Sequence, residues 1–246
     1  MKRRNLLAAA GAALVAGCGK VGESAPMRAL FRNSDNWHRG LHDLLGRRTA
    51  LAKEYPESAI SPFFRGNGSR TVDSDAYRSA LAAGFPDWRL EVRGLVTSPL
   101  SLSLDEIRAL PQRTQITRHD CVEGWSAIGQ WTGPQLSTIL DLAGLDETAR
   151  FIVFRCADNL NGGDYYESVD MIDALHPQTV IAHALNGEPL PERNGAPLRV
   201  RIERQLGYKS AKFLTAIEAV ESLDAIGAGK GGYWEDRSGY QWYAGI

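Results

Sequence analysis

Closely spaced turn residues limit the length of any helix or strand in this chain. The 246 residues include 25 glycines and 11 prolines. Turn signals recur roughly every ten positions, a spacing typical of many short elements rather than of a helical bundle. Apolar residues make up 43% of the chain, enough to bury one full core. We therefore predict a mixed α+β fold, mainly β, with short helices.

Caps and apolar spacing predict short helices in four parts of the chain. The first begins at Ser34 and stops before Pro56. Ser103 and Glu106 form a capping box that opens the second, which ends before Pro111. The other two are expected from residue 134 to a closing glycine at 144, and at 170–175.

Alternating or continuous apolar residues predict the strands. The expected ranges are 88–92, 113–118, 151–156, 179–185, 197–203 and 212–221. Loops are expected at 61–74 and 161–163, where Gly, Asn and Pro cluster, and in the aromatic tail at 231–246. No internal repeat is visible, so these elements are expected to form one large domain.

The amino terminus has the pattern of an export signal. Arg3 and Arg4 precede an apolar run that is too short to span a bilayer. The paired arginines resemble a twin-arginine signal, and Val15-Ala16-Gly17-Cys18 resembles a lipobox in which Cys18 is acylated. An ordinary secretory peptide with an incidental cysteine is the alternative.

This pattern predicts the domain organisation and the location of the protein. Residues 1–18 are assigned to the export signal, 19–59 to a tether and helical lead-in, and 60–246 to the main domain. The expected location is the periplasm or another extracytoplasmic compartment, with a lipid at Cys18. The net charge is -1 and the pI is about 6.5, so neither nucleic acid nor an anionic membrane surface is an expected partner.

The segment from Thr117 to Trp125 places Cys121 in a polar, partly basic setting before a Gly-Trp turn. Arg118 and His119 can favour the thiolate, which attacks electrophiles or binds soft metals. On a strand, His119 and Cys121 would lie on the same face. Cys121 is therefore a candidate metal ligand or nucleophile.

Several other roles for Cys121 stay open at this point. A disulfide or redox pair with Cys156 is possible in an oxidising compartment, and a cysteine hydrolase could use His119, His176 or His183. No local hydrolase signature surrounds Cys121, and zinc is disfavoured. Neither Cys-x-x-Cys nor Cys-x-x-Cys-His occurs, which excludes an attached c-type haem.

A second group of residues combines cationic side chains with glycines. It runs through Asn194–Arg199, Arg204 and Gly207–Lys212. Such a set suits a phosphate-bearing or heteroaromatic ligand, and a solvated basic strand edge is the alternative. The aromatic tail could instead serve a cofactor-free binding module, although such residues are more often core; its members are Tyr233, Trp234, Tyr240, Trp242 and Tyr243.

From about residue 60 to the end, these segments resemble the molybdopterin-binding domain of the sulfite oxidase family. Within it they are similar to bacterial single-domain proteins related to periplasmic methionine-sulfoxide reductases. The Arg-x-x-Cys-Val-Glu-Gly-Trp motif at 118–125 carries the resemblance. It implies a molybdenum–molybdopterin cofactor with Cys121 as the protein ligand of the metal. The dimerisation domain of sulfite oxidases is absent, so a monomer is expected.

The resemblance also implies roles for other residues. Arg118 or Arg65 would steer the substrate, and Tyr166, next to Tyr165, would line the substrate pocket unless it is a packed aromatic. Cys156 stands where the family has a threonine near the cofactor. The remaining residues expected to contact the cofactor are Phe64, Arg65, Asn67, Asn194, Arg199, Lys209, Ser210, Ala211 and Lys212.

The activity implied is oxygen-atom transfer to or from a small sulfur–oxygen compound, of the sulfite or S-oxide type. Without haem of its own, the domain would exchange electrons with a separate redox protein, such as a cytochrome c or a membrane haem or quinol protein. The alternatives are a thiol–disulfide redox protein using Cys121 and Cys156, and the cofactor-free binding module.

Overall fold

The computed structural model describes residues 24–27 and 33–246, in two compact units that divide at Leu45 and Gly46. In the first unit, helix α3 (Ser34–Leu44) confirms the helix predicted from Ser34, and it ends well before Pro56. The predicted export signal and Cys18 lie outside the described residues. None of the helices in the described ranges is long and apolar enough to cross a membrane.

The second unit begins at Gly46, earlier than the predicted start at residue 60. Arg48 is buried in it and pairs through Nη2 with Asp170 Oδ1 at 2.5 Å and Asp173 Oδ2 at 2.8 Å. The Ala52 backbone N–H donates to Gln178 Oε1 at 2.7 Å. The segment that follows Gly46 is therefore packed against the rest of this unit.

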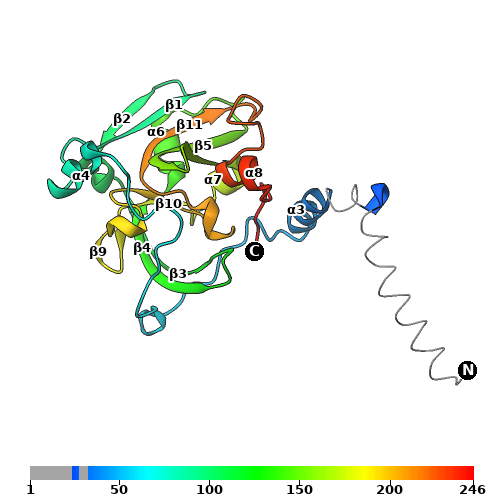
Figure 1. Ribbon diagram of the computed structural model, residues 1–246, viewed down its shortest axis with the longest axis horizontal. Coiled ribbons are helices and arrows are strands. Elements are labelled where there is room, and N and C mark those ends of the chain that lie inside the picture. Colours follow the sequence, from blue (N-terminus) through cyan, green and yellow to red (C-terminus); the bar gives the residue numbers. More distant parts are fainter. Residues whose placement is uncertain (1–23, 28–32) are drawn as a thin grey trace, which may run out of the picture. The chain divides into compact units, whose positions relative to one another are not determined.

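Most strands lie in two sheets (Figure 1). A five-stranded sheet has the order β2 (Leu100–Ser103), β1 (Arg89–Gly94), β11 (Leu214–Val220), β5 (Phe151–Leu160), β6 (Gly163–Asp170). Within it, β1 pairs parallel to β11 and the other pairs are antiparallel. A four-stranded antiparallel sheet has the order β3 (Gln112–Asp120), β4 (Ser126–Pro134), β8 (Ala184–Leu185), β9 (Glu188–Pro189). β10 (Arg199–Arg201) pairs with β7 (Val180–Ala182).

Short helices connect and cover the strands, which confirms the mixed α+β prediction. They are η1 (Glu57–Ala59), α4 (Asp75–Ala82), α5 (Leu104–Ala109), α6 (Leu136–Ala143), α7 (Met171–Ala174), η2 (Glu192–Asn194), η3 (Gly207–Lys209) and α8 (Tyr233–Ser238). The capping box is confirmed: Glu106 N–H donates to Ser103 Oγ, and Ser103 N–H donates to Glu106 Oε2. Gly144 ends α6 in the left-handed region, with φ of 66°.

Several elements differ from the sequence expectation. The tail contains helix α8 instead of being wholly loop, and α4, β2, β4, β6 and β9 had no counterpart in the prediction. β4 carries Gly129, Gly133 and Pro134, which have low strand propensity. It forms because nine of its residues pair in register with β3, from Ser126 opposite Asp120 to Pro134 opposite Gln112.

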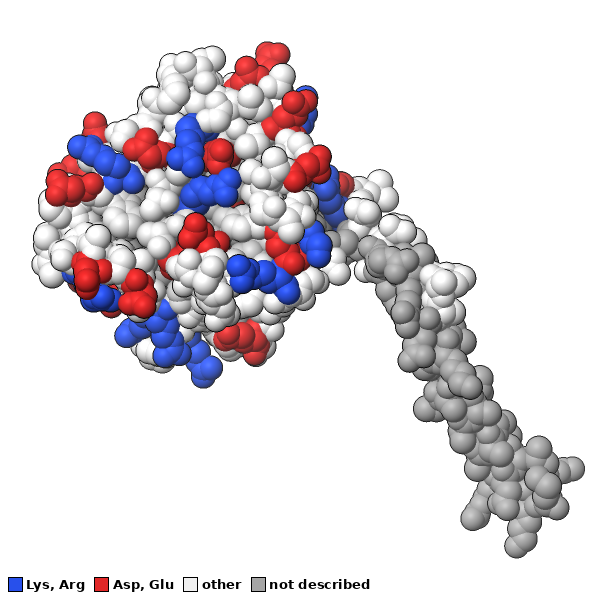
Figure 2. Space-filling view, turned by 45° about the horizontal axis from the view of Figure 1, so that its top comes forward, with Lys and Arg blue, Asp and Glu red and all other residues white. Residues whose placement is uncertain are grey.

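Acidic and basic side chains are interspersed on the face in Figure 2, and neither sign covers it. This distribution agrees with the net charge of -1. On this face, charge of one sign is therefore not concentrated over a large area.

Candidate functional site

Cys121 lies at the tip of the β3–β4 hairpin, where the sequence predicted a tight turn. Its backbone N–H donates to Trp125 O at 2.9 Å, and Gly124 N–H donates to Cys121 O at 3.0 Å. Gly124 has a φ of 84°, which side chains strongly disfavour. The Cys121 thiol is buried and accepts a hydrogen bond from Asn67 Nδ2 at 3.3 Å.

The prediction that Arg118 and His119 favour the thiolate is wrong. Burial raises the pKa of the Cys121 thiol. Arg118 is exposed on the opposite side of β3, where its Nε pairs with Asp120 Oδ2 at 3.0 Å. Burial, followed by the charge of Arg201, lowers the pKa of His119 well below its usual value, so this imidazole is neutral. A bound metal ion would supply the positive charge that a thiolate needs here.

A cavity beside the Cys121 turn is assembled from segments that are far apart in the sequence. Five predicted cofactor residues line it: Asn67, Arg199, Ser210, Ala211 and Lys212. Other lining residues are Glu123, Asp158, Tyr165, Gly207, Trp234 and Tyr240. The indole of Trp234 stacks on the Tyr240 ring with centroids 5.6 Å apart, forming an aromatic wall.

Two cations in this lining, the buried Arg199 and the half-buried Lys212, have no carboxylate partner among the residues that the structure describes. Arg199 donates to the backbone carbonyls of Asn194 and Ser210 at 3.0 and 2.9 Å, and among the described residues it makes no ion pair within 4.0 Å. Lys212 Nζ donates to the carbonyls of Asn67, at 2.7 Å, and Ser69. Burial, followed by neighbouring positive charge, lowers the pKa of Arg199 to about 9 and that of Lys212 to about 7. A bound anion would stabilise the charged forms of both side chains.

Two side chains of the cavity lining, Arg199 and Asp158, also carry unsatisfied polar atoms. Buried side-chain atoms without a hydrogen-bond partner include Arg199 Nε, Asn194 Oδ1, Asp158 Oδ1 and His119 Nε2. Native proteins rarely leave such atoms unpaired unless a ligand or water satisfies them. Donors, acceptors and uncompensated positive charge together fit a ligand that combines a phosphate with a heteroatom-rich ring, which is the chemistry of a molybdopterin.

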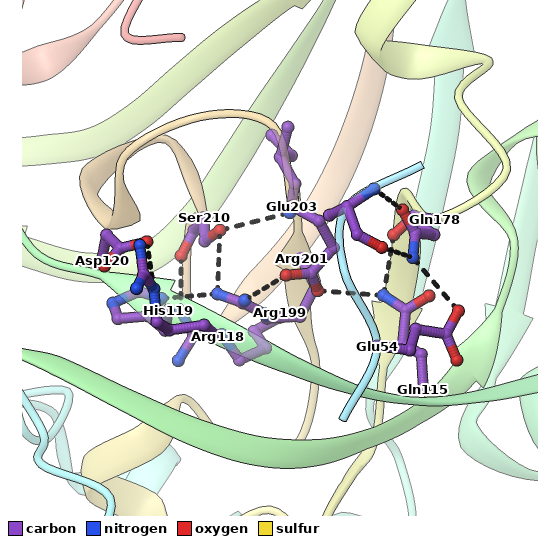
Figure 3. Close-up of polar contacts among 12 residues, drawn as sticks. Glu54, Gln115, Arg118, His119, Asp120, Gln178, Arg199, Arg201, Glu203 and Ser210 are labelled. Carbon is purple, nitrogen blue, oxygen red and sulfur yellow. Dashed lines mark hydrogen bonds and ion pairs between the residues drawn. The ribbon is translucent and has the colours of Figure 1, made fainter. Parts of the chain in front are cut away.

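His119 is held by a buried chain of polar contacts (Figure 3). Arg201 Nη1 lies 2.6 Å from His119 Nδ1, and Arg201 Nη2 donates to Glu203 Oε2 at 2.7 Å. A guanidinium only donates, so Nδ1 accepts and the proton resides on Nε2. Gly207 packs against this atom so closely that an added Cβ would lie 2.2 Å from Nε2. The sequence had suggested His119 as a group that favours the Cys121 thiolate or as a hydrolase base, and not as a neutral donor held by Arg201.

The other histidines proposed for hydrolysis are used elsewhere. His176 Nε2 bonds the Ala50 carbonyl, and His183 Nε2 bonds Gln112 Oε1. Within the described ranges, no cluster of three or more His, Cys, Asp or Glu side chains could hold a metal. A metal bound at Cys121 would therefore take most of its ligands from a cofactor.

Tyr165, and not Tyr166, lines the cavity. The two residues are neighbours on β6, so their side chains point to opposite faces. Tyr165 donates to the Tyr208 carbonyl at 2.9 Å beside the cavity. Tyr166 donates to a carboxylate oxygen of Asp236 and is not among the lining residues. The position in the pocket that the sequence predicted for Tyr166 is therefore occupied by Tyr165.

Lys209 is fully buried and points away from the cavity lining. Its ammonium lies 2.8 Å from Glu167 Oε2 and 2.6 Å from Glu235 Oε1. Burial raises the pKa of Glu167 well above its usual value. Two carboxylates therefore already surround the amine, and Lys209 does not line the cavity as its neighbours Ser210, Ala211 and Lys212 do.

The remaining predicted residues surround the cavity without lining it. Phe64 is buried and contacts the rings of His119 and Trp131, with centroids 5.5 and 5.0 Å away. Asn194 is buried, and its Nδ2 donates to the Arg65 carbonyl at 3.3 Å. The Arg65 side chain lines a neighbouring pocket.

The structure of the cysteines argues against a thiol–disulfide redox protein, and that of the aromatic tail argues against a cofactor-free binding module. Cys121 and Cys156 are free thiols, and burial raises the pKa of both, which disfavours thiolate chemistry. In the aromatic tail, Tyr233 and Tyr243 are buried, so much of the tail packs as core.

Comparison with known proteins agrees with this site. Residues 80–224 match the model of the oxidoreductase molybdopterin binding domain. The chain is 41% identical over 235 residues to the putative protein-methionine-sulfoxide reductase subunit YedZ1 of Azospira oryzae, covering 96% of this chain and 83% of that protein. It is 34% identical over 165 residues to the protein-methionine-sulfoxide reductase catalytic subunit MsrP of Xanthomonas campestris pv. campestris.

The second alignment covers 62% of this chain, which spans about half (51%) of that catalytic subunit. The fold is similar to that of the sulfane dehydrogenase SoxCD from Paracoccus pantotrophus, with a TM-score of 0.53 and 20% identity, over 62% of this chain and 41% of that one. The chain therefore belongs to the oxidoreductase molybdopterin-binding domain family, of the sulfite oxidase type, and is a molybdopterin-dependent oxidoreductase.

Proposed function

We propose that this chain catalyses oxygen-atom transfer from an organic S-oxide, reducing it to the thioether with electrons from a separate redox protein. The observation that carries the proposal is the buried Cys121 thiol, bonded by Asn67, beside a cavity whose cations lack carboxylate partners. The direction is supported by two relatives that are named as methionine-sulfoxide reductase subunits.

The residues divide into metal-binding and cofactor-binding roles. Cys121 would ligate the molybdenum, and Arg199 and Lys212 would hold the phosphate of the molybdopterin. Asn194 Oδ1 and the His119 Nε2–H group would offer one acceptor and one donor to the cofactor. When bound, the cofactor supplies two-electron oxygen-atom transfer, while the protein provides ligation, orientation and electrostatics.

The aromatic wall of the cavity suits an organic substrate. Trp234 and Tyr240 stack there, and Tyr165 adds a third ring. Apolar ring faces exclude water around a thioether carbon skeleton, while the few polar groups fix its orientation. This chemistry favours an organic S-oxide over a small inorganic oxyanion such as sulfite.

The proposed function includes a location outside the cytoplasm and a separate protein as electron donor. The twin-arginine-like and lipobox-like patterns near Cys18 support export followed by lipid anchoring outside the cytoplasm. The sequence has no attachment motif for c-type haem. A cytochrome c or a membrane haem or quinol protein would therefore supply electrons.

Metal analysis and paired activity assays test the function. Protein purified from a host that makes molybdopterin should contain one molybdenum per chain. It should reduce methionine sulfoxide and dimethyl sulfoxide with reduced viologen faster than it oxidises sulfite with ferricyanide. Preferential sulfite oxidation would reverse the proposed direction, and protein without molybdenum would refute the assignment.

Cofactor-free protein should be stabilised by phosphate or pyrophosphate. The buried Arg199 and the half-buried Lys212 repel each other, neither pairs with a carboxylate of the described residues, and a bound anion would relieve the repulsion. A ligand at 100 times its Kd adds about 2.7 kcal/mol, and each kcal/mol raises the Tm by about 2–4 °C in a domain of this size. Thermal melts in phosphate and in chloride at equal ionic strength measure the shift. Arg199→Gln should reduce it, whereas the surface change Arg89→Gln should not.

A further inference from the structure

A second pocket opens next to the Cys121 turn and contains three arginines. Phe63, Arg65 and Arg70 contribute from the 61–74 loop, Arg193 from η2, and Glu123 and Trp125 from the Cys121 turn. We call this set the arginine pocket. Its volume of about 410 Å³ is in the range of small-molecule sites.

Aromatic rings support two of the guanidinium groups. Arg193 lies over the Phe63 ring, 5.3 Å from its centroid, and Arg65 lies 6.0 Å from the centroid of Trp125. Stacking on a ring leaves the N–H groups at the edge of the guanidinium available to a ligand. The exposed position of Phe63 thus has an explanation, because its ring supports Arg193.

The charge of the arginine pocket is not neutralised. Three guanidinium groups face one carboxylate, that of Glu123, and among the described residues none of the three arginines makes an ion pair within 4.0 Å. Glu192, beside Arg193 in the chain, accepts a hydrogen bond from Thr71 instead. Nine other arginines pair with carboxylates, namely Arg48, Arg78, Arg89, Arg93, Arg108, Arg113, Arg118, Arg155 and Arg201.

The arginine pocket adjoins the cofactor cavity. Glu123 lines both of them, two residues after Cys121. The 61–74 loop that carries two of the arginines also carries Asn67, which bonds the Cys121 thiol. A substrate whose sulfur lies at the metal site could therefore place a second group, a few bonds away, among the arginines.

We propose that the arginine pocket binds a carboxylate of the substrate, so that the substrates are organic S-oxides that carry such a group. Arginine binds carboxylates bidentately, which gives both affinity and orientation. This inference rests on the proposed function. In the reaction the S–O bond breaks and sulfur is reduced by two electrons, which the redox partner delivers one at a time. The oxygen takes up two protons and leaves as water.

The test compares two substrates of nearly equal size on the molybdenum-loaded enzyme. N-acetylmethionine sulfoxide carries a carboxylate, and its methyl amide is neutral. Arg193→Gln and Arg65→Gln should each raise the KM for the anion by about 10-fold, the scale of one lost charge-assisted hydrogen bond. The kcat and the KM for the amide should stay within about two-fold. Arg89→Gln, an exposed arginine paired with Glu106, is the matched control.

The outcomes separate this inference from the proposed function. Equal rises in KM for both substrates, or no change for either, would overturn the role of the arginine pocket while leaving S-oxide reduction intact. If neither substrate is reduced, calorimetric titration of the loaded protein with N-acetylmethionine sulfoxide decides. Binding that Arg193→Gln abolishes would support the arginine pocket alone, and absence of binding would overturn both.

Discussion

Replacing Cys121 by serine is expected to abolish turnover and to leave the fold intact. An alcohol is a hard, weakly acidic ligand that cannot replace a soft thiolate on molybdenum. Loss of groups that only support a metal ligand already costs about 10- to 100-fold, so loss of the ligand itself should exceed that. Viologen-linked S-oxide reduction, molybdenum content and the visible absorption of the metal–thiolate bond measure the effect.

The fold should survive because serine is smaller than cysteine and the turn is held by backbone bonds to Trp125 and from Gly124. An unchanged Tm is therefore the control for misfolding. Cys156→Ser provides the comparison for thiol chemistry and should lose less than about 10-fold in turnover, below the range of about 10- to 100-fold for groups that support a metal ligand. Full turnover in Cys121→Ser, or equal inactivation by both changes, would contradict the ligand assignment.

Replacing Lys209 by methionine should cost about 3–5 kcal/mol of the free energy of unfolding. The change leaves Glu167 and Glu235 buried without their shared cation. Burial already raises the pKa of Glu167 above the usual 4.5, and removal of the ammonium would raise it further. Urea unfolding followed by circular dichroism measures the loss.

The loss in Lys209→Met should grow with pH once the pH exceeds the pKa of Glu167 in the wild-type fold, which burial already holds above 4.5. Above that pH the wild-type Glu167 ionises beside the ammonium of Lys209, whereas in the variant the folded Glu167 stays protonated. Glu235→Gln is the matched change, because it leaves one ammonium facing one carboxylate, and it should cost less than about 2 kcal/mol. Equal losses in the two variants, or a gap that narrows with rising pH, would show that the cluster is not held by charge pairing.

Local sequence predicted the parts of the site that depend on neighbouring residues. The Cys121 turn follows from Gly124 and the strand before it, and the capping box of α5 follows from Ser103 and Glu106. These features need only a few consecutive residues, so the sequence is sufficient. The same holds for α6, which Gly144 ends.

Features that depend on contacts between distant residues could not be predicted from the sequence. The Asn67–Cys121 bond joins residues 54 positions apart, and the His119–Arg201 contact joins residues 82 apart. The choice between Tyr165 and Tyr166 depends on which face of β6 meets the cavity, and no strand was predicted at this position. A one-residue error in strand position reverses every side chain. The pKa of Cys121 likewise depends on burial. Its polar neighbours in the sequence gave no sign that the thiol is buried.

The cofactor cavity brings residues from Asn67 to Tyr240 together. The Trp234–Tyr240 wall exists only after the segment that carries it has been translated and has packed against the rest of the cavity. We therefore expect the complete cofactor cavity to form only in the folded protein. Export in an already folded state would then preserve the loaded enzyme, whereas threading an unfolded polypeptide would deliver it empty.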